Sequence, residues 1–212
     1  SDRISSNIGR MRNTGIELSL SSTNFARRNF TWTTNFNMAH NTNKILELYN
    51  GVPTSFGSYA WMEGYDSQTW NLVRWAGVDP SDGSPMWYDK NGNVTRTFST
   101  ANRVPGKTRT PLLSGGLVNN MSWKNWTLSF QINYLIGGYA LPTYASIYFK
   151  DGYDIISENQ AVEVYKYRWT TAGVPAKFPK VSNLSSKSAM NSTRFLYNRT
   201  NFDLTNVALT YN

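Results

Sequence analysis

The chain of 212 residues contains no cysteine and a single histidine, His40. The lack of cysteine excludes disulfides, thiolate nucleophiles and cysteine-ligated metals. Histidine-rich metal sites are excluded as well, and a Ser-His-Asp centre would have to be built around His40. We therefore expect no catalytic residue, no metal site and no cofactor, and predict that the protein is not an enzyme. A surface hydrolase that pairs His40 with a serine is the enzymatic alternative.

Charged residues and long apolar runs are also scarce. Asp, Glu, Lys and Arg make up 16% of the chain, well below the ~25% of an average protein. No stretch approaches the ~18 apolar residues that a membrane helix needs. Any membrane-spanning part must then be built from strands, because only helices and closed barrels pair all of their backbone groups in lipid.

The most regular pattern of the chain lies in residues 126–136. One parity is apolar throughout and comprises Trp126, Leu128, Phe130, Ile132, Tyr134 and Ile136. The other parity consists mainly of hydroxyl and amide residues, Thr127, Ser129, Gln131 and Asn133. A two-residue period predicts a strand. Eleven strand residues tilted near 40° rise about 28 Å, which matches the apolar band of an outer membrane.

Further alternating segments predict the organisation of the chain. We expect strands at 15–24, 30–44, 114–122, 126–136 and 202–212, with long loops at 45–113 and 137–201. Short and long connections therefore take turns, as in outer-membrane barrels with tight periplasmic turns and long extracellular loops. The sequence predicts an all-β fold, a segment of an antiparallel up-and-down transmembrane β-barrel with two long extracellular loops.

The polar parity of these strands is nearly free of charge. A sheet face in contact with bulk water normally carries Lys and Glu, so a neutral face indicates a water-filled lumen. Phe25, Phe30, Trp123 and Trp126 flank the two short turns, where interfacial rings are expected. A soluble β-sandwich alternates in the same way, and a soluble glycan-binding module or adhesin is the alternative function.

The net charge of +8 does not point to nucleic acid. Its basic residues are scattered over turns and loops, without a basic helix or a nucleic-acid motif. Loop cations next to the anionic outer leaflet of a Gram-negative membrane explain the charge better. We therefore expect lipid and lipopolysaccharide as partners and no nucleic acid.

Several short motifs follow one another along the chain in a fixed order. They are Asn7-Ile8-Gly9, Met11-Arg12-Asn13, Gly15-Ile16-Glu17-Leu18, Trp75-Ala76-Gly77-Val78-Asp79-Pro80 with Gly83, Pro85, Trp87-Tyr88-Asp89 and Gly92, then Pro111, Gly115-Gly116, Gly137-Gly138, Arg168-Trp169, Arg194-Phe195-Leu196-Tyr197 and Asn206-Val207 with Leu209, Tyr211 and Asn212. Together they resemble the SusC/RagA group of TonB-linked outer-membrane transporters over nearly the whole chain.

This resemblance implies a barrel of about 22 strands, of which this chain supplies about five. It also implies a location in the Gram-negative outer membrane and active import of oligosaccharides or peptides. The implied partners are a SusD-like surface lipoprotein and the TonB complex, which would act through an N-terminal part. That part, the plug domain and the closing strands are expected to lie outside this chain.

Ligand contacts are expected in the long loops. Tyr59, Trp61, Trp70 and Trp87 could stack on sugar rings, although packing of the loop on itself is the commoner role of such residues. The oxygens of residues 79–83 and 89–93 suggest calcium, but Asn91-Gly92 favours a type I′ hairpin. Residues 157–169 form the one helical candidate, with Ser157 as N-cap and Gln160 in the capping-box position.

Overall fold

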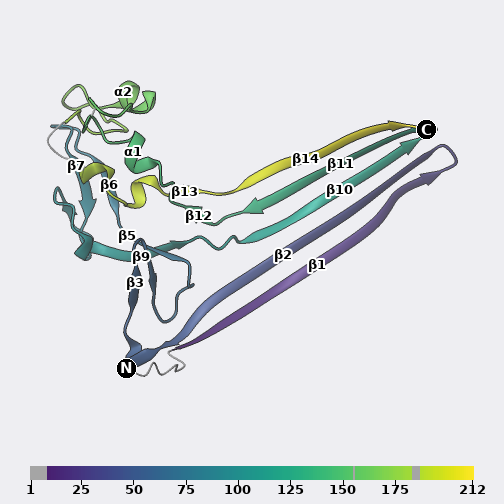
Figure 1. The fold of residues 1–212 in the computed structure, drawn as a ribbon, viewed down its shortest axis with the longest axis horizontal. Coiled ribbons are helices and arrows are strands. Elements are labelled where there is room, and N and C mark those ends of the chain that lie inside the picture. Colours follow the sequence, from purple (N-terminus) through teal and green to yellow (C-terminus); the bar gives the residue numbers. More distant parts are fainter. Residues whose placement is uncertain (1–8, 155, 183–186) are drawn as a thin grey trace.

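Five antiparallel strands form one long sheet in the computed structural model, which describes residues 9–154, 156–182 and 187–212 (Figure 1). Its strands are β1 (Gly9–Arg27), β2 (Phe30–Leu48), β10 (Leu113–Trp123), β11 (Trp126–Ile136) and β14 (Asn201–Tyr211). They lie in the order β1-β2-β10-β11-β14, so each strand pairs with its predecessor among these five. The predicted up-and-down antiparallel architecture is confirmed. Asn7 and Ile8 of the first motif lie outside the described residues.

The first two strands are longer than the alternation suggests. β1 begins six residues before the expected start at Gly15, and β2 continues to Leu48, where the two ends pair as Gly9 with Leu48. Residues 9–14 have no apolar alternation, so only the pairing of their backbone groups with β2 reveals the strand. Nineteen residues span roughly 60 Å, about twice an apolar band, and carry the sheet well beyond it.

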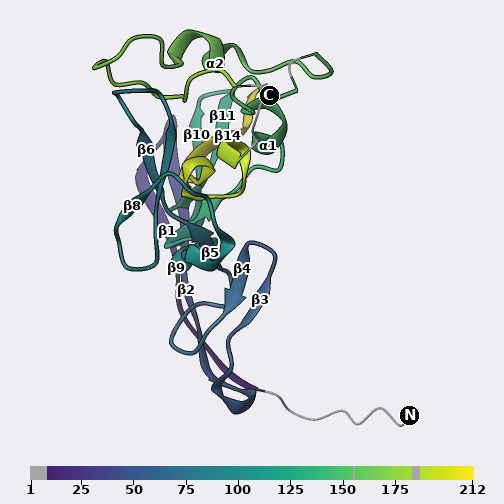
Figure 2. The same ribbon diagram turned by 90° about the vertical axis from the view of Figure 1, so that its left-hand side faces the viewer.

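The sheet is a single layer. Figures 1 and 2 show no second sheet or helix packed over β1, β2, β10, β11 and β14 away from the loops. Every residue of β1 and β14 is exposed, and Trp32 is 36% exposed on the apolar face. No helix in the described ranges is long and apolar enough to cross a membrane. A soluble sandwich needs a second layer to cover this face, and the described residues provide none.

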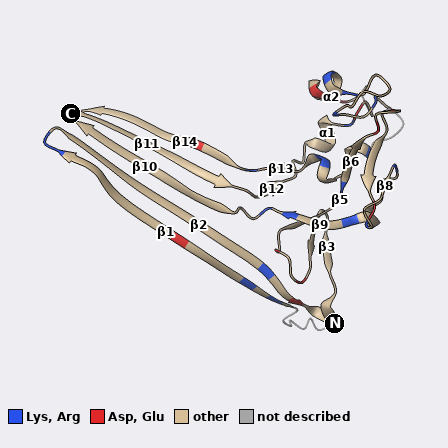
Figure 3. Cartoon of the chain, turned by 180° about the vertical axis from the view of Figure 1, so that it is seen from behind, with Lys and Arg blue, Asp and Glu red and all other residues tan. Residues whose placement is uncertain are grey.

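Charge avoids the central part of this sheet (Figure 3). β10 and β11 contain no charged residue, and β14 contains only Asp203. Neighbouring strands place their apolar residues on the same face, as in the row Trp126 to Tyr211, Leu128 to Leu209 and Phe130 to Val207. One apolar face and one neutral polar face follow from this register.

Aromatic rings mark both ends of the apolar face. Near the short turns, the rings of Phe25 and Phe30 lie 5.6 Å apart and those of Trp126 and Tyr211 lie 4.9 Å apart. Towards the loops, Tyr134 stacks between Phe36 at 6.1 Å and Phe202 at 6.2 Å. Eight residues separate the two levels on β11, about 26 Å along the strand. Such a pair of girdles bounds the apolar band of an outer-membrane barrel.

Gly115 leaves room for the Tyr134 ring in the aromatic level nearer the loops. A Cβ atom at this position would lie 2.6 Å from the Tyr134 hydroxyl and 2.1 Å from the backbone oxygen of Asn37. Without it, Tyr134 lies flat across β10 and donates a hydrogen bond of 2.9 Å to that oxygen on β2. The absence of a side chain at this glycine therefore makes room for the Tyr134 ring, which links β11, β10 and β2.

A polar cluster interrupts the apolar face. Asn119, which is 5% exposed, accepts hydrogen bonds at its Oδ1 from Trp32 Nε1 at 2.9 Å and from the Thr34 hydroxyl at 2.7 Å. Asn24 Nδ2 donates in turn to Thr34 at 2.6 Å. These groups satisfy one another, which lets polar residues occupy a face that would otherwise lose hydrogen-bonding partners in lipid.

The two long connections fold into one lobe at the far end of the sheet from the short turns (Figures 1 and 2). The first contains η1 (Tyr49–Gly51), β3 (Thr54–Phe56), β4 (Tyr59–Trp61), β5 (Thr69–Val73), β6 (Trp75–Val78), β7 (Pro85–Tyr88), β8 (Val94–Thr95), η2 (Thr100–Asn102) and β9 (Arg103–Thr108). The second contains β12 (Tyr139–Ala140), α1 (Ala145–Tyr148), α2 (Val162–Tyr167), η3 (Lys187–Ala189), η4 (Thr193–Phe195) and β13 (Tyr197–Asn198).

A lysine on each face of the sheet tests which face meets lipid. We expect Phe130→Lys, midway between the two aromatic levels, to lower the free energy of unfolding of the intact protein from lipid vesicles by about 2 to 4 kcal/mol, because a charge near the bilayer midplane is costly. Ser129→Lys, on the polar face, is the matched control and is expected to cost less than about 1 kcal/mol. Both free energies are measured by urea titration, in which gel electrophoresis separates folded from unfolded protein by mobility. Equal losses would contradict the assignment of the faces.

Candidate functional site

The lobe is organised around one buried ion pair. Arg194 of η4 donates from Nη1 and Nη2 to the two carboxylate oxygens of Asp151, at 2.6 Å and 2.8 Å. The side chains are 5% and 3% exposed, and Arg194 also donates to the backbone oxygen of Ser188 at 2.9 Å. Removal of either partner would leave an uncompensated buried charge, so the pair locks the geometry of the second loop.

Aromatic rings surround the guanidinium of this pair. Its central carbon lies 4.9 Å from the ring centroid of Trp75, 5.2 Å from that of Phe178 and 5.0 Å from that of Phe195. Trp75 belongs to the first long loop, whereas the other two belong to the second. Arg194 therefore joins the two loops by cation–π contacts in a desolvated position, where such contacts are strongest.

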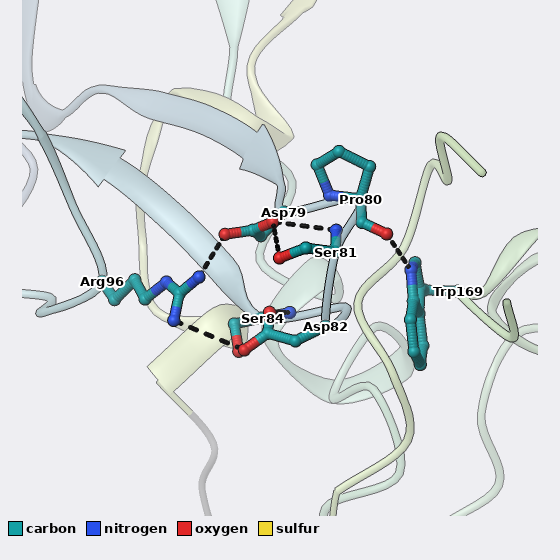
Figure 4. A network of polar contacts seen from close by, with 7 residues as sticks. All are labelled: Asp79, Pro80, Ser81, Asp82, Ser84, Arg96 and Trp169. Carbon is teal, nitrogen blue, oxygen red and sulfur yellow. Dashed lines mark hydrogen bonds and ion pairs between the residues drawn. The ribbon is translucent and has the colours of Figure 1, made fainter. Parts of the chain in front are cut away.

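A second contact between the loops is built on an acidic turn (Figure 4). Asp79, at the end of β6, accepts hydrogen bonds at one carboxylate oxygen from the backbone N–H and hydroxyl of Ser81, at 2.9 Å and 2.6 Å, and pairs with Arg96 at the other. Asp82 lies 3.4 Å from the same guanidinium. The hydrogen bonds from Ser81, followed by Arg96, lower the pKa of Asp79 from 3.8 to about 2.

Trp169 of the second loop covers this turn (Figure 4). Its Nε1 donates to the Pro80 backbone oxygen at 2.9 Å, and its ring occupies the space where a Cβ on Gly83 would lie, 2.6 Å away. Gly83 also has a φ of +74°, which favours glycine. The backbone of the turn at Gly83 thus forms the surface against which the Trp169 indole packs.

Hydrogen bonds and ion pairs occupy the carboxylates of the acidic turn. The described residues contain no group of three or more metal-ligating His, Asp or Glu side chains. The hydrogen bonds to Ser81, Ser84 and Arg96 already use the carboxylates of Asp79 and Asp82. The calcium hypothesis therefore finds no support in these side chains.

The following hairpin forms, but with a different turn. β7 pairs with β8, and Gly92 N–H donates to Asp89 O at 3.2 Å. Gly92 alone has a positive φ, +94°, whereas a type I′ turn would need two such residues. The turn is a type I turn followed by a left-handed glycine, because the Asp89 carboxylate caps the N–H groups of Asn91 and Asn93.

Comparisons with known proteins agree with this architecture. No protein-family model matches the chain. TonB-dependent receptor P26 of Formosa agariphila is 25% identical over 229 aligned positions, which cover 97% of this chain and 22% of that protein. TonB-dependent receptor SusC of Bacteroides thetaiotaomicron is 24% identical over 161, which cover 68% and 16%.

Solved structures match more completely. The RagAB peptide transporter superposes on 97% of this chain with a TM-score of 0.81 at 24% identity, and the match covers 23% of that chain. The RagAB peptide importer in its closed-closed state has the same TM-score at 25% identity and the same coverage. The resemblance to the SusC/RagA group over nearly the whole chain is confirmed. It spans about a fifth of the length of these relatives, 16% to 23%.

The SusC/RagA motifs of the two loops meet in space. Trp75, from the first-loop motif, contacts Arg194 from the second, and Gly83 contacts Trp169. Packing between the two loops therefore explains the residue types at these four motif positions. The sequence offered no signal for Asp151, which resembles the other acidic residues of the second loop and is identified only by its contact with Arg194.

The predicted ligand-stacking residues separate into buried and exposed ones. Trp87 is 1% exposed and packs edge-on against Trp75 and Phe98, so it belongs to the core of the lobe. Trp70 is 6% exposed, stacks on Tyr59 at 4.1 Å and donates from Nε1 to the Tyr139 backbone oxygen. Both indoles are largely buried in the lobe, and their contact with a ligand stays a prediction.

Trp61 is the exposed member of the predicted set. It is 36% exposed and lies edge-on to Phe56 at 5.0 Å. Both rings line a cavity of about 790 Å³ between the β3–β4 hairpin and the ends of β1 and β2. Its wall includes Tyr49 and Val52, so it suits an apolar or ring-shaped group. Contact of Trp61 with a ligand remains a prediction.

The predicted helix is shorter than its sequence pattern. α2 comprises only Val162–Tyr167, and its N-cap is Ala161, without a side-chain hydrogen bond. Ser157 donates to the Asp154 backbone oxygen, and Gln160 bonds to the backbone of Gly152 and Tyr153. These tertiary contacts win over the capping box and keep residues 157–160 in a turn.

The Arg194–Asp151 pair should control the stability of the lobe. We expect Asp151→Asn in the intact protein to destabilise the lobe by about 3 to 5 kcal/mol, because Arg194 keeps a buried charge without a counter-ion. Lys180→Gln, at an exposed residue of the same loop, is the control. Limited proteolysis followed by mass spectrometry reports the opening of loop residues 137–200. Equal protection in both variants would show that the pair is dispensable.

The acidic turn predicts a pH dependence. Folding lowers the pKa of Asp79 from 3.8 to about 2, so the ionised carboxylate favours the folded turn. This stabilisation is fully present above about pH 4 and is lost as the pH falls towards about 2. The protection factors of the amides in residues 79–84, that is their exchange rates relative to an unfolded chain at the same pH, should fall across that window. In Asp79→Asn, the same residues should already be less protected at neutral pH, and the pH-dependent loss of protection should be absent. If the variant keeps that loss, another titrating group causes it.

Proposed function

We propose that this chain forms part of the barrel wall and extracellular mouth of an outer-membrane TonB-dependent active transporter. The observation that carries the proposal is a single-layer sheet with an apolar face bounded by two aromatic levels, joined to a lobe like that of RagAB. The polar face then lines the lumen. The protein is not expected to be an enzyme, since its relatives are receptors and transporters.

The imported nutrient is proposed to be an oligosaccharide or a peptide. One relative is SusC, and the matched structures are of a peptide transporter. The exposed Trp61 and the cavity that it lines provide a candidate contact at the extracellular end. Tyr59 stacks on Trp70 and serves as support for this region.

The proposed partners follow from the same comparison. A SusD-like surface lipoprotein would cover the lobe, and α2 offers it a surface on which Val162, Tyr165 and Tyr167 are 56%, 70% and 54% exposed. TonB would act through an N-terminal part of the longer protein. The apolar face of the sheet would contact lipid and lipopolysaccharide of the Gram-negative outer membrane.

Fractionation of cells that express the tagged full-length protein tests this proposal. We expect the protein in the detergent-extracted outer membrane, together with a surface lipoprotein that co-purifies with it. Deletion of its gene should abolish uptake of one class of fluorescent oligosaccharide or peptide, and collapse of the proton gradient that drives TonB should have the same effect. Recovery of the protein in the soluble fraction would favour a soluble binding module instead.

A further inference from the structure

A second cavity of the lobe differs from the apolar one in its charge. It has a volume of about 620 Å³ and lies along β5 and β9. Three alternate residues of one face of the β5 segment line it, Trp70, Leu72 and Arg74. Lys107 of β9 contributes a second cation, and no acidic residue is among the residues that line it.

Neither cation has an acidic partner among the described residues. Arg74 donates from Nη2 to the backbone oxygen of Asp89 at 3.0 Å, and its Nε is buried without a hydrogen-bond partner. The only described contact of the Lys107 ammonium is with the Tyr139 ring, 5.2 Å from the centroid. By contrast, Arg96 and Arg194 are both paired with carboxylates. A buried donor without an acceptor is costly, and an incoming anion would satisfy it.

Aromatic rings line the cavity beside the two cations. The Arg74 guanidinium lies 5.3 Å from the Tyr88 centroid, and the Trp70 indole and the Tyr139 ring line the same cavity. Val73 pairs with Arg103, so Arg74 and Lys107 are separated by about five positions, roughly 15 Å along the strands. The cavity therefore offers two cations well apart along the strands, each next to an aromatic ring.

We propose that this cavity binds a carboxylate-bearing oligomer, with one carboxylate on Arg74 and another on Lys107. Guanidinium and ammonium groups form charge-assisted hydrogen bonds with carboxylates, while the rings beside them pack against the C–H groups of the backbone or sugar of the ligand. The inference rests on the proposed import function and names the substrate class as acidic. An oligouronate and an acidic peptide share this chemistry, and the experiment separates them.

Binding to the full-length protein in detergent tests the cavity. Isothermal titration compares tetragalacturonate, tetraglutamate and the uncharged maltotetraose as probes. We expect one acidic probe to bind at least tenfold more tightly than maltotetraose, and its affinity to fall as sodium chloride is raised from about 0.05 M to about 0.5 M. The preferred acidic probe identifies the source of the carboxylates.

Two variants and one control assign that binding to the cavity. Arg74→Gln and Lys107→Gln should each weaken binding of the acidic probe by about tenfold, through loss of one charge-assisted hydrogen bond. Lys90→Gln, at the exposed tip of the β7–β8 hairpin, removes the same charge outside the cavity and should have no effect. The Lys107 ammonium makes no hydrogen bond in the described structure, so the Lys107→Gln variant keeps the test valid if Arg74→Gln fails to fold.

The outcomes separate this inference from the import function. Failure of both acidic probes to bind, equal binding of maltotetraose, or unchanged affinity in both variants would overturn the acidic site. Uptake of a neutral nutrient by the same cells would then leave the import function standing. The opposite outcome is a protein that is recovered in the soluble fraction and binds the acidic probe, in cells that take up no nutrient through it. This would overturn the import function and leave the acidic site intact.

Discussion

The pairing of backbone groups along a single sheet places every side chain of the five long strands. In a single layer no core buries the strands, so the register of β2, β10, β11 and β14 alone decides which side chains share a face. Because this register aligns apolar residues with apolar residues, one face can meet hydrocarbon while the other remains wet. β1 and β14 each have one edge without a strand partner among the described residues, where a barrel wall would continue.

Polar groups on the apolar face obey the same constraint. Asn119, Thr34 and Trp32 lie where alternation predicts lipid contact, yet Asn119 Oδ1 accepts hydrogen bonds from both Trp32 and Thr34. The Tyr134 hydroxyl finds its acceptor on the backbone of β2. In both cases a side chain bridges neighbouring strands, so polarity within the band adds cross-strand links without leaving groups unsatisfied.

A different physical principle holds the lobe. Its strands are short, and few of its apolar residues are fully buried, so burial alone gives it a small core. Arg194 compensates by acting at once as an ion-pair partner for Asp151 and as a cation for rings of both loops. The acidic turn under Trp169 adds a second link of the same kind. The lobe is thereby a pre-organised surface, in which Trp61 and the cation-lined cavity keep fixed positions.

Local patterns in the sequence predict the five strands of the sheet, their order and the character of each face, because the two-residue period of a strand is a local property. They do not predict the extension of β1 and β2 towards the loops. The sequence also favoured the hairpin at Asn91-Gly92, although not its turn type, which the Asp89 carboxylate decides. Which aromatic residues are buried depends on long-range packing, since Trp87 and Trp61 look alike in sequence but differ in the rings that surround them. The partner of Arg194 and the pair of cations at Arg74 and Lys107 likewise depend on contacts between distant segments, which no local pattern encodes.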